Sequence, residues 1–446
     1  MFYELRRTLP IAIPLILSNI TQMSLGLIDS AMVGAIDYFQ LAASSLVVNA
    51  IAIPQVIGTG ITMAISPLAA FANGKKDISK VSQLLYNNFW LSVYIGLIIS
   101  VSLAWGSNVL LHLQQDDKVA HLSIPYFEIM AWSLFPMMIF LSMKQFADGL
   151  EHTKVGMVLS LGALPVNALL CWIFIFGKLG MPRLELVGAG IATLITRMLQ
   201  AMVMAAIIYR HQLFQPFIKV RHVAWQMHAG TIKELLHIGI PSSMQYAMEA
   251  GAFSVSGIMI GWLGATAQAA HQIALNCASL TFMASLGLSL AASIRVSNAF
   301  GQKNMQLLRS IGTSAIAAAI SYGVLCAIIF IVFRFQLPLL FNNDPIVVSM
   351  AAYLLLLGAL FQISDATQSI GVGLLRGIKD VKRPTLYVAI AYWVIGIPAG
   401  YWLAFKWQMG AAGIWLGFVA GLTASSILLN HRFLRKTHPG FKMYDL

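Results

Sequence analysis

Residues 310–333, SIGTSAIAAAISYGVLCAIIFIVF, form a predominantly apolar run without a single charged side chain. A helix rises about 1.5 Å per residue, so a run of this length can cross a hydrocarbon core of about 30 Å. Inside lipid every backbone N–H and C=O must be paired within the chain, and a helix meets that demand. The stretch therefore predicts a transmembrane helix.

Similar apolar runs fill most of the chain. Of its 446 residues 59% are hydrophobic and 10% are charged, whereas a soluble domain has roughly 25% charged residues. Runs bounded by charged residues, proline or glycine predict twelve spans, at 10–36, 44–71, 85–113, 124–147, 155–178, 186–210, 236–263, 270–298, 310–336, 346–373, 384–404 and 410–432. We therefore expect an all-α polytopic membrane protein.

The net charge of +12 is distributed unevenly along the chain. Lysine and arginine gather at one end of alternate spans, and the loops assigned to the cytoplasm carry about four times as many as the outer loops. We expect both termini in the cytoplasm and a location in the plasma membrane. The expected partners are membrane lipids and small molecules, not nucleic acid, and we expect a monomer.

The chain also resembles itself. An offset of 227 aligns Ile13-Pro14 with Ile240-Pro241 and Asn49 with Asn276. Because an even number of spans separates the copies, both copies have the same orientation in the membrane. The repeat predicts two six-helix lobes related by a pseudo-two-fold axis along the membrane normal.

This repeat sets the expected domain organisation. We predict an N-lobe at 1–210, a cytoplasmic interdomain loop at 211–235, a C-lobe at 236–434 and a cytoplasmic tail at 435–446.

Three carboxylates lie in the interior of predicted spans, away from the span ends: Asp29, Glu249 and Asp365. A charged side chain near a helix centre costs on the order of 2.5–3.5 kcal/mol on insertion scales, so each needs a compensating contact or a water-filled cavity. Residues three, four or seven positions apart share a helix face. Each carboxylate shares its helix face with other polar residues. These are Ser18 and Gln22 for Asp29, Ser242, Gln245 and Ser256 for Glu249, and Gln362, Gln368 and Ser369 for Asp365.

These stripes predict an acidic internal cavity. Its candidate lining residues are Gln22, Gln245 and Gln368, together with the mid-span amides Asn167 and Asn276. The alternative for the amides and serines is hydrogen bonding between helices, or to carbonyls that a nearby proline leaves unpaired. A carboxylate in such a cavity can hold a proton, or stay ionised beside a bound cation. One site that serves a coupling ion and a cationic substrate in turn would drive an antiporter.

Other functional classes lack a matching motif. We find no H-E-x-x-H, G-x-S-x-G, P-loop or dinucleotide fingerprint, so we expect neither an enzyme nor an ATP-driven pump. The expected requirement is Na⁺ or H⁺ as the coupling ion, with no other cofactor. Cys171, Cys277 and Cys326 stand alone in apolar runs and are expected to be small buried residues.

Four segments, spread over both halves of the chain, form a recognisable set: Gly26-Leu-Ile-Asp-Ser-Ala-Met-Val-Gly34, Ala269-Ala-His-Gln-Ile-Ala274, Ser364-Asp-Ala-Thr-Gln368 and Leu375-Arg-Gly-Ile-Lys-Asp380. They resemble segments of the multidrug and toxic compound extrusion (MATE) transporters, and among these the NorM-like bacterial branch. The resemblance covers essentially the whole chain. It implies a twelve-helix, two-lobed antiporter that exports cationic or amphipathic compounds in exchange for sodium ions or protons.

The resemblance also assigns roles to residues. Asp29 and Asn167 match residues of the family's N-lobe cation or proton site, while Glu249 and Asp365 match the C-lobe carboxylates, where Na⁺ is expected. The sequence has Ser256 where the repeat would place a second copy of Asp29, which leaves open which lobe couples transport.

Two rival interpretations remain. A flippase for a lipid-linked or polyanionic substrate would need a basic cavity. Lys144 and Arg197, two basic residues inside predicted spans, are expected near span ends. A membrane-embedded enzyme or a passive channel is the other alternative.

Overall fold

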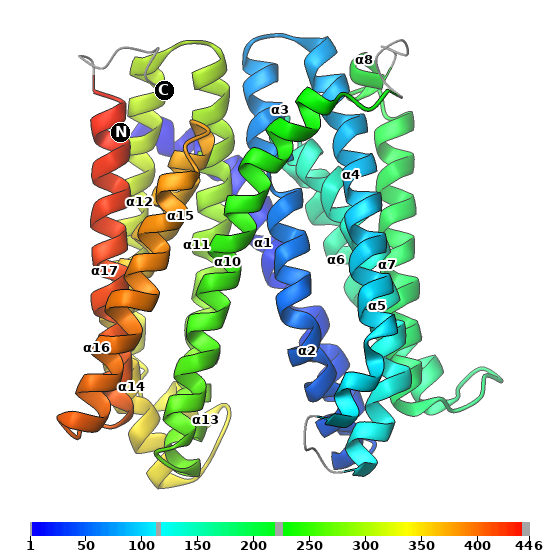
Figure 1. Cartoon of the computed structure of the whole chain (residues 1–446), viewed down its shortest axis with the longest axis vertical. Coiled ribbons are helices and arrows are strands. Elements are labelled where there is room, and N and C mark those ends of the chain that lie inside the picture. Colours follow the sequence, from blue (N-terminus) through cyan, green and yellow to red (C-terminus); the bar gives the residue numbers. More distant parts are fainter. Residues whose placement is uncertain (1, 113–116, 219–225, 439–446) are drawn as a thin grey trace. The chain divides into compact units, whose positions relative to one another are not determined.

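The computed structural model describes residues 2–112, 117–218 and 226–438, and these residues form helices and connecting loops without a strand (Figure 1). The first half of the chain contains α1 (Phe2–Gly34), α2 (Tyr38–Thr62), α3 (Ile65–Gly74), α4 (Ile78–Trp105), the 3₁₀ helix η1 (Ser107–His112), α5 (Asp117–Gly149), α6 (Thr153–Phe176), α7 (Glu185–Arg210) and α8 (Gln215–Ile218). The second half contains α10 (Ala229–Gly261), α11 (Ala265–Gly301), α12 (Met305–Val332), α13 (Gln336–Leu339), α14 (Pro345–Gly377), α15 (Lys382–Ala389), η2 (Ile390–Gly396), α16 (Ile397–Tyr401), η3 (Trp402–Lys406) and α17 (Ala411–Lys436).

Every predicted span coincides with one of these helices or helix runs. Eleven of them, within the described residues, are long and apolar enough to cross a membrane. The twelfth predicted span is α10, which is 33 residues long but carries Ser242, Ser243, Gln245 and Glu249 in its middle. α10 is therefore as long as the other spans, but these polar residues make its composition less apolar than theirs.

Prolines explain two irregular stretches. Pro67 lacks an N–H, and the second span is broken nearby between Thr62 and Ile65. Before Pro398 the chain adopts the π-helical segment η2, whose wider turn accommodates the missing hydrogen bond.

The described chain divides into two compact units. The first unit is Leu17–Ser243, and the second unit combines Met1–Ile16 with Met244–Leu446. The divisions thus fall inside α1 and α10 and not in the connection between the halves. Residues 219–225 of the expected interdomain loop and 439–446 of the expected tail lie outside the described residues, and the domain boundaries stay a prediction.

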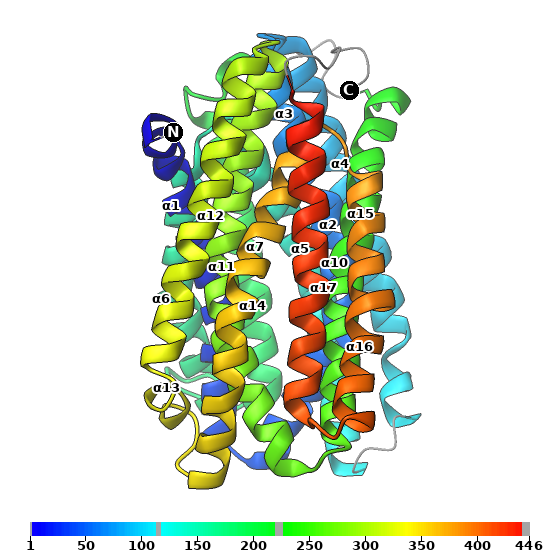
Figure 2. The same cartoon turned by 90° about the vertical axis from the view of Figure 1, so that its left-hand side faces the viewer.

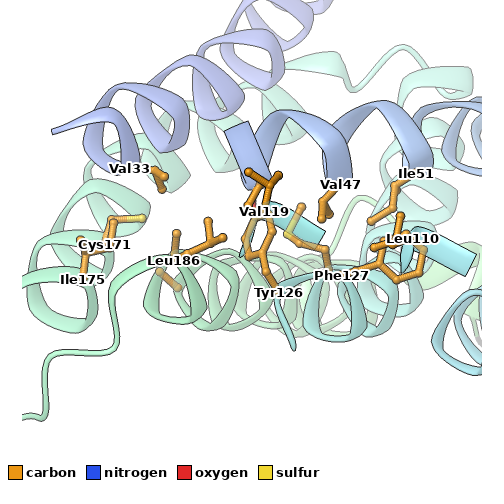
Figure 3. Close-up of a cluster of buried hydrophobic side chains, with 14 of the residues drawn as sticks. Val33, Val47, Ile51, Leu110, Val119, Tyr126, Phe127, Cys171, Ile175 and Leu186 are labelled. Carbon is orange, nitrogen blue, oxygen red and sulfur yellow. The ribbon is translucent and has the colours of Figure 1, made fainter. Parts of the chain in front are cut away.

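The first unit has a core built around α5. Tyr126 and Phe127 of this helix are almost fully buried against Val47 and Ile51 of α2 (Figure 3). Cys171 of α6 joins the same cluster. This packing brings α1, α2, α5, α6 and α7 to the cavity described below.

In the second unit α14 packs against α11, α12 and α17. Beside α17 runs the segment from α15 to η3 (Figure 2). Here the helices approach so closely that a Cβ on Gly421 would lie 2.5 Å from the Ala391 carbonyl oxygen. Small residues at such crossings allow backbones in lipid to pack directly.

A reciprocal pair of contacts shows why the units divide within helices. A Cβ on Gly60 of α2 would lie 2.5 Å from the Ser243 Cα, and a Cβ on Gly287 of α11 would lie 2.7 Å from the Ile16 nitrogen. The offset of 227 relates Gly60 to Gly287 and Ile16 to Ser243. In the first unit, therefore, the first half of α10 packs against α2. In the second unit, the first half of α1 packs against α11.

Candidate functional site

The first unit contains a cavity of about 200 Å³. Asp29 contributes the carboxylate of its lining, and Met130, Met137 and Phe140 contribute apolar surface. The remaining polar lining residues include Gln22, Ser30, Ser44, Gln55, Asn167, Thr193, Thr196, Arg197 and Gln200. The cavity can therefore accept a ligand that is apolar over part of its surface and charged at one point.

Asp29 has hydrogen-bond donors on both carboxylate oxygens. The Thr193 hydroxyl donates to Oδ2 at 2.8 Å, and the Cys171 thiol donates to Oδ1 at 3.3 Å. Asn167, one helical turn before Cys171, also contacts this carboxylate. Asp29 is 8% exposed, so these contacts replace the water that a buried carboxylate would lose.

A guanidinium lines the same cavity. Arg197 acts electrostatically on Asp29, and its Nη1 donates to the Ser133 hydroxyl at 2.7 Å. Our expectation that Arg197 lies near a span end, outside the cavity, is therefore wrong. The cavity is not simply acidic, because it holds one carboxylate and one guanidinium.

The second unit places Glu249 of α10 beside α14. Glu249 Oε1 accepts from Gln245 Nε2 at 3.0 Å and from Gln368 Nε2 at 3.1 Å. Arg376 of α14 acts electrostatically on this carboxylate. A small pocket, lined in part by Gln245, Glu249 and Gln368, lies at this point.

Asp365 lies on α14, one turn before Gln368. Its side chain is 4% exposed, and its Oδ2 has no hydrogen-bond partner among the described residues. The negative charge that acts on it is that of Glu249. The second unit thus brings together two carboxylates, and one oxygen of this pair is buried without a donor.

The predicted site residues divide into these two groups. Gln22 and Asn167 line the cavity with Asp29, while Gln245 and Gln368 donate to Glu249. Asn276 belongs to neither group: its Oδ1 accepts from Gln272 on an exposed part of α11. Its role in lining a substrate cavity, and sodium binding at Glu249 and Asp365, stay predictions.

Several contact residues were not predicted from the sequence. Thr193 and Cys171 belong to apolar runs, and Cys171 was assigned to packing alone. Its spacing of four from Asn167 places both on one helix face, a signal that could have identified it. All three cysteines are buried and unpaired. Tyr392, which contacts Gln368, gave no comparable signal because tyrosine is common in apolar helices.

Comparison with known proteins gives a consistent picture. A family model described as MatE matches residues 14–173 and 241–402. The chain is 33% identical over 437 residues to multidrug resistance protein MdtK of Proteus mirabilis, covering 96% of this chain and 95% of that protein. It is 34% identical over 449 residues to MdtK of Yersinia pseudotuberculosis, covering 98% and 97%.

Solved structures share the fold at lower identity. The crystal structure of the eukaryotic MATE transporter AtDTX14 matches with a TM-score of 0.87 and 21% identity, covering 98% of both chains. A MATE structure in the bent conformation matches with a TM-score of 0.89 and 18% identity, covering 97% of this chain and 95% of that one. A MOP superfamily transporter from Pyrococcus furiosus, described as having a binding pocket of reverse polarity, gives 0.88 and 18%, with 96% and 95% covered.

The fold, the spans and the buried polar groups define a multi-pass α-helical membrane transporter with two compact units. Family model and full-length relatives then identify it further. The chain belongs to the multidrug and toxic compound extrusion family, as its sequence motifs predicted.

Proposed function

We propose that this protein is a secondary active multidrug efflux antiporter. It exports organic cations and amphipathic drugs in exchange for Na⁺ or H⁺ by alternating access. The observation that carries the proposal is the buried carboxylate pair of the second unit, in which Asp365 Oδ2 lacks a donor beside the charge of Glu249. Two buried like charges are costly, and a sodium ion or a proton between them relieves the repulsion. We favour sodium on the resemblance to the NorM-like branch.

The substrate class follows from the first-unit cavity. Met130, Met137 and Phe140 offer adaptable apolar surface, while Asp29 offers a negative charge to a cationic group. The names of the MdtK relatives, multidrug resistance proteins, agree with a broad substrate range. Small cationic and amphipathic molecules are the proposed partners, together with membrane lipids, and the working unit is a monomer.

The second candidate function is a flippase for a lipid-linked or polyanionic substrate. Arg197 in the first-unit cavity is the observation that favours it. A polyanion would need several cations, however, whereas this guanidinium faces the charge of Asp29 in the same cavity. The antiporter therefore fits the charges of the cavity better.

Orientation is part of the proposal. We place both termini in the cytoplasm of a bacterial cell, with the chain in the inner membrane. A single cysteine at Asp117, at the start of α5, is then labelled by an impermeant reagent only from outside. One at Lys219, which lies outside the described residues, is labelled only from inside.

The decisive experiment measures transport of a fluorescent lipophilic cation in proteoliposomes. Sodium and pH gradients are imposed separately, without ATP. Transport driven by either gradient supports the antiporter and identifies the ion. Transport of a lipid-linked anion with neither ion driving the cation would establish the flippase instead.

A further inference from the structure

The amide of Gln368 lies between Glu249 and Tyr392, and its orientation follows from its neighbours. An ionised carboxylate can only accept hydrogen bonds, so the amide nitrogen must face it. Gln368 Nε2 donates to Glu249 Oε1 at 3.1 Å, and Oε1 of the same amide is 3.4 Å from the Tyr392 hydroxyl. That amide oxygen can only accept, so the tyrosine donates. The three groups form a directed chain from Tyr392 through Gln368 to Glu249.

Tyr392, the first donor of this chain, is buried and packs against an aromatic ring. It is 3% exposed, and its ring lies 6.1 Å from that of Phe253. It belongs to η2, the π-helical segment before Pro398. Such π segments are frequent at functional sites, because the wider turn redirects side chains.

The next residue of η2 approaches Glu249 by a second route. Trp393 Nε1 donates to the backbone oxygen of Met248 at 3.2 Å, directly before Glu249 in α10. Two successive residues of η2 therefore contact the surroundings of Glu249. Tyr392 acts through the Gln368 side chain, and Trp393 acts through the α10 backbone.

We infer that Tyr392 is a positioning residue for the coupling-ion site of the second unit: its hydroxyl keeps the Gln368 amide turned so that Nε2, and not Oε1, faces Glu249. The inference rests on the proposed ion coupling. With the amide in this orientation, Gln368 and Gln245 both donate to Glu249 and compete with an incoming cation for the carboxylate oxygen. The hydroxyl thereby keeps ion binding weak enough for release.

Removal of the hydroxyl changes this competition in one direction. In a Tyr392→Phe variant the amide oxygen loses its donor, and the amide can turn to present Oε1 to a cation at Glu249. The ion then meets one fewer competing donor and one more oxygen ligand. A typical hydrogen bond corresponds to about a fivefold change in an equilibrium constant, so we expect the ion to bind about fivefold more tightly.

The test measures the half-saturating concentration of the ion that drives the wild-type protein in proteoliposomes. We expect Tyr392→Phe to lower it about fivefold with a slower maximal rate, because the ion leaves more slowly. Tyr401→Phe is the matched control, since Tyr401 lies on α16 with its side chain exposed, and should match the wild type. Expression level and Tm verify that each variant is folded.

A double-mutant cycle separates positioning from packing. Gln368→Met keeps the length of the side chain and removes the amide. If Tyr392 acts through Gln368, adding Tyr392→Phe to Gln368→Met produces no further shift in the half-saturating concentration. Additive shifts, or a Tyr392→Phe value within twofold of wild type, overturn the inference while leaving the antiporter intact. Failure of the wild-type protein to respond to either ion would instead refute the proposed function, and the inference with it.

Discussion

The two units treat their buried carboxylates differently. In the first unit both oxygens of Asp29 receive a hydrogen bond, and Arg197 supplies a nearby positive charge. In the second unit Glu249 receives two amide donors on one oxygen, while Asp365 Oδ2 receives none. A buried carboxylate without donors is costly unless a cation or proton joins it. The protein itself satisfies the carboxylate of the first site, whereas the second site keeps one buried carboxylate oxygen without a donor.

We expect the largest effect from substitutions that remove the difference between the units, at the carboxylates of the second unit. Glu249→Gln and Asp365→Asn should each abolish gradient-driven efflux of a fluorescent cation, because each removes a charge from the proposed coupling-ion site. Both substitutions preserve side-chain shape, so expression and Tm should stay near normal. Asp29→Asn should impair efflux as much or less, since Asp29 is already satisfied.

Asp117→Asn serves as the matched control, because Asp117 is an exposed carboxylate at the start of α5, and its efflux should equal that of the wild type. Ion-driven efflux that survives in the Glu249→Gln, Asp365→Asn double variant would contradict the assignment. The coupling site would then move to Asp29 and Asn167.

The second prediction concerns two ion pairs. One holds the first half of α1 in the second unit, and the other holds the first half of α10 in the first unit. Arg295 of α11 donates to the Glu4 carboxylate, and also to the Glu4 backbone oxygen and the Thr8 hydroxyl, each at 2.7 Å. Both ends of this pair are 8% exposed, whereas Lys80 and Glu234, 2.9 Å apart in the first unit, are about 30% exposed. Burial makes the loss of one partner far more costly.

We therefore expect Arg295→Met to destabilise the protein by about 3–5 kcal/mol. Lys80→Met should cost about 0–1 kcal/mol, because water replaces the lost partner. Denaturant titration of the purified variants measures both. Equal losses would mean that the two pairs make the same contribution in spite of their different burial.

The smallest effect tests the repeat itself. Gly60→Ala and Gly287→Ala each place a Cβ within 2.7 Å of backbone atoms of Ser243 and Ile16, respectively, so each should cost about 1–3 kcal/mol. Gly162→Ala on α6 is the control, since nothing lies within 4 Å of its Cβ. Similar falls in Tm for Gly60→Ala and Gly287→Ala would support the equivalence of the α2–α10 and α11–α1 crossings. A stable Gly287→Ala variant would show that the second crossing tolerates a side chain.

The sequence predicted the helices well because lipid imposes simple rules. Long apolar runs must become helices, and each of the twelve predicted spans coincides with a helix or a run of helices, eleven of which are apolar enough to cross a membrane among the described residues. The spans in the structure extend further at many ends, as α11 does to Gly301, because polar residues continue a helix beyond the hydrocarbon core. The break near Pro67 and the π turn before Pro398 could not be specified from the sequence, since proline shows where a hydrogen bond is lost but not how the chain adjusts.

The sites were predicted in part, for a related reason. Charged residues in apolar runs are conspicuous, and Asp29, Glu249 and Asp365 were identified in this way. Their partners Thr193, Cys171 and Tyr392 are tolerated anywhere in a membrane helix, so only tertiary packing reveals them. Arg197 was misplaced although it lies near the middle of the predicted span 186–210, so its position in the sequence already indicated a site deep in the membrane.

The first half of α1 belongs to the second unit, and this arrangement affects the order in which the protein can assemble. Glu4 and Arg295 are 291 residues apart in the chain, so the opening segment of α1 leaves the ribosome long before its partner helix exists. The first unit, in contrast, has all of its segments once Ser243 has been synthesised. Biogenesis therefore follows an order in which Leu17–Ser243 can assemble early, while Met1–Ile16 waits for α11 to enter the membrane. A nascent chain that stops before α11 leaves the Glu4 carboxylate without the guanidinium of Arg295.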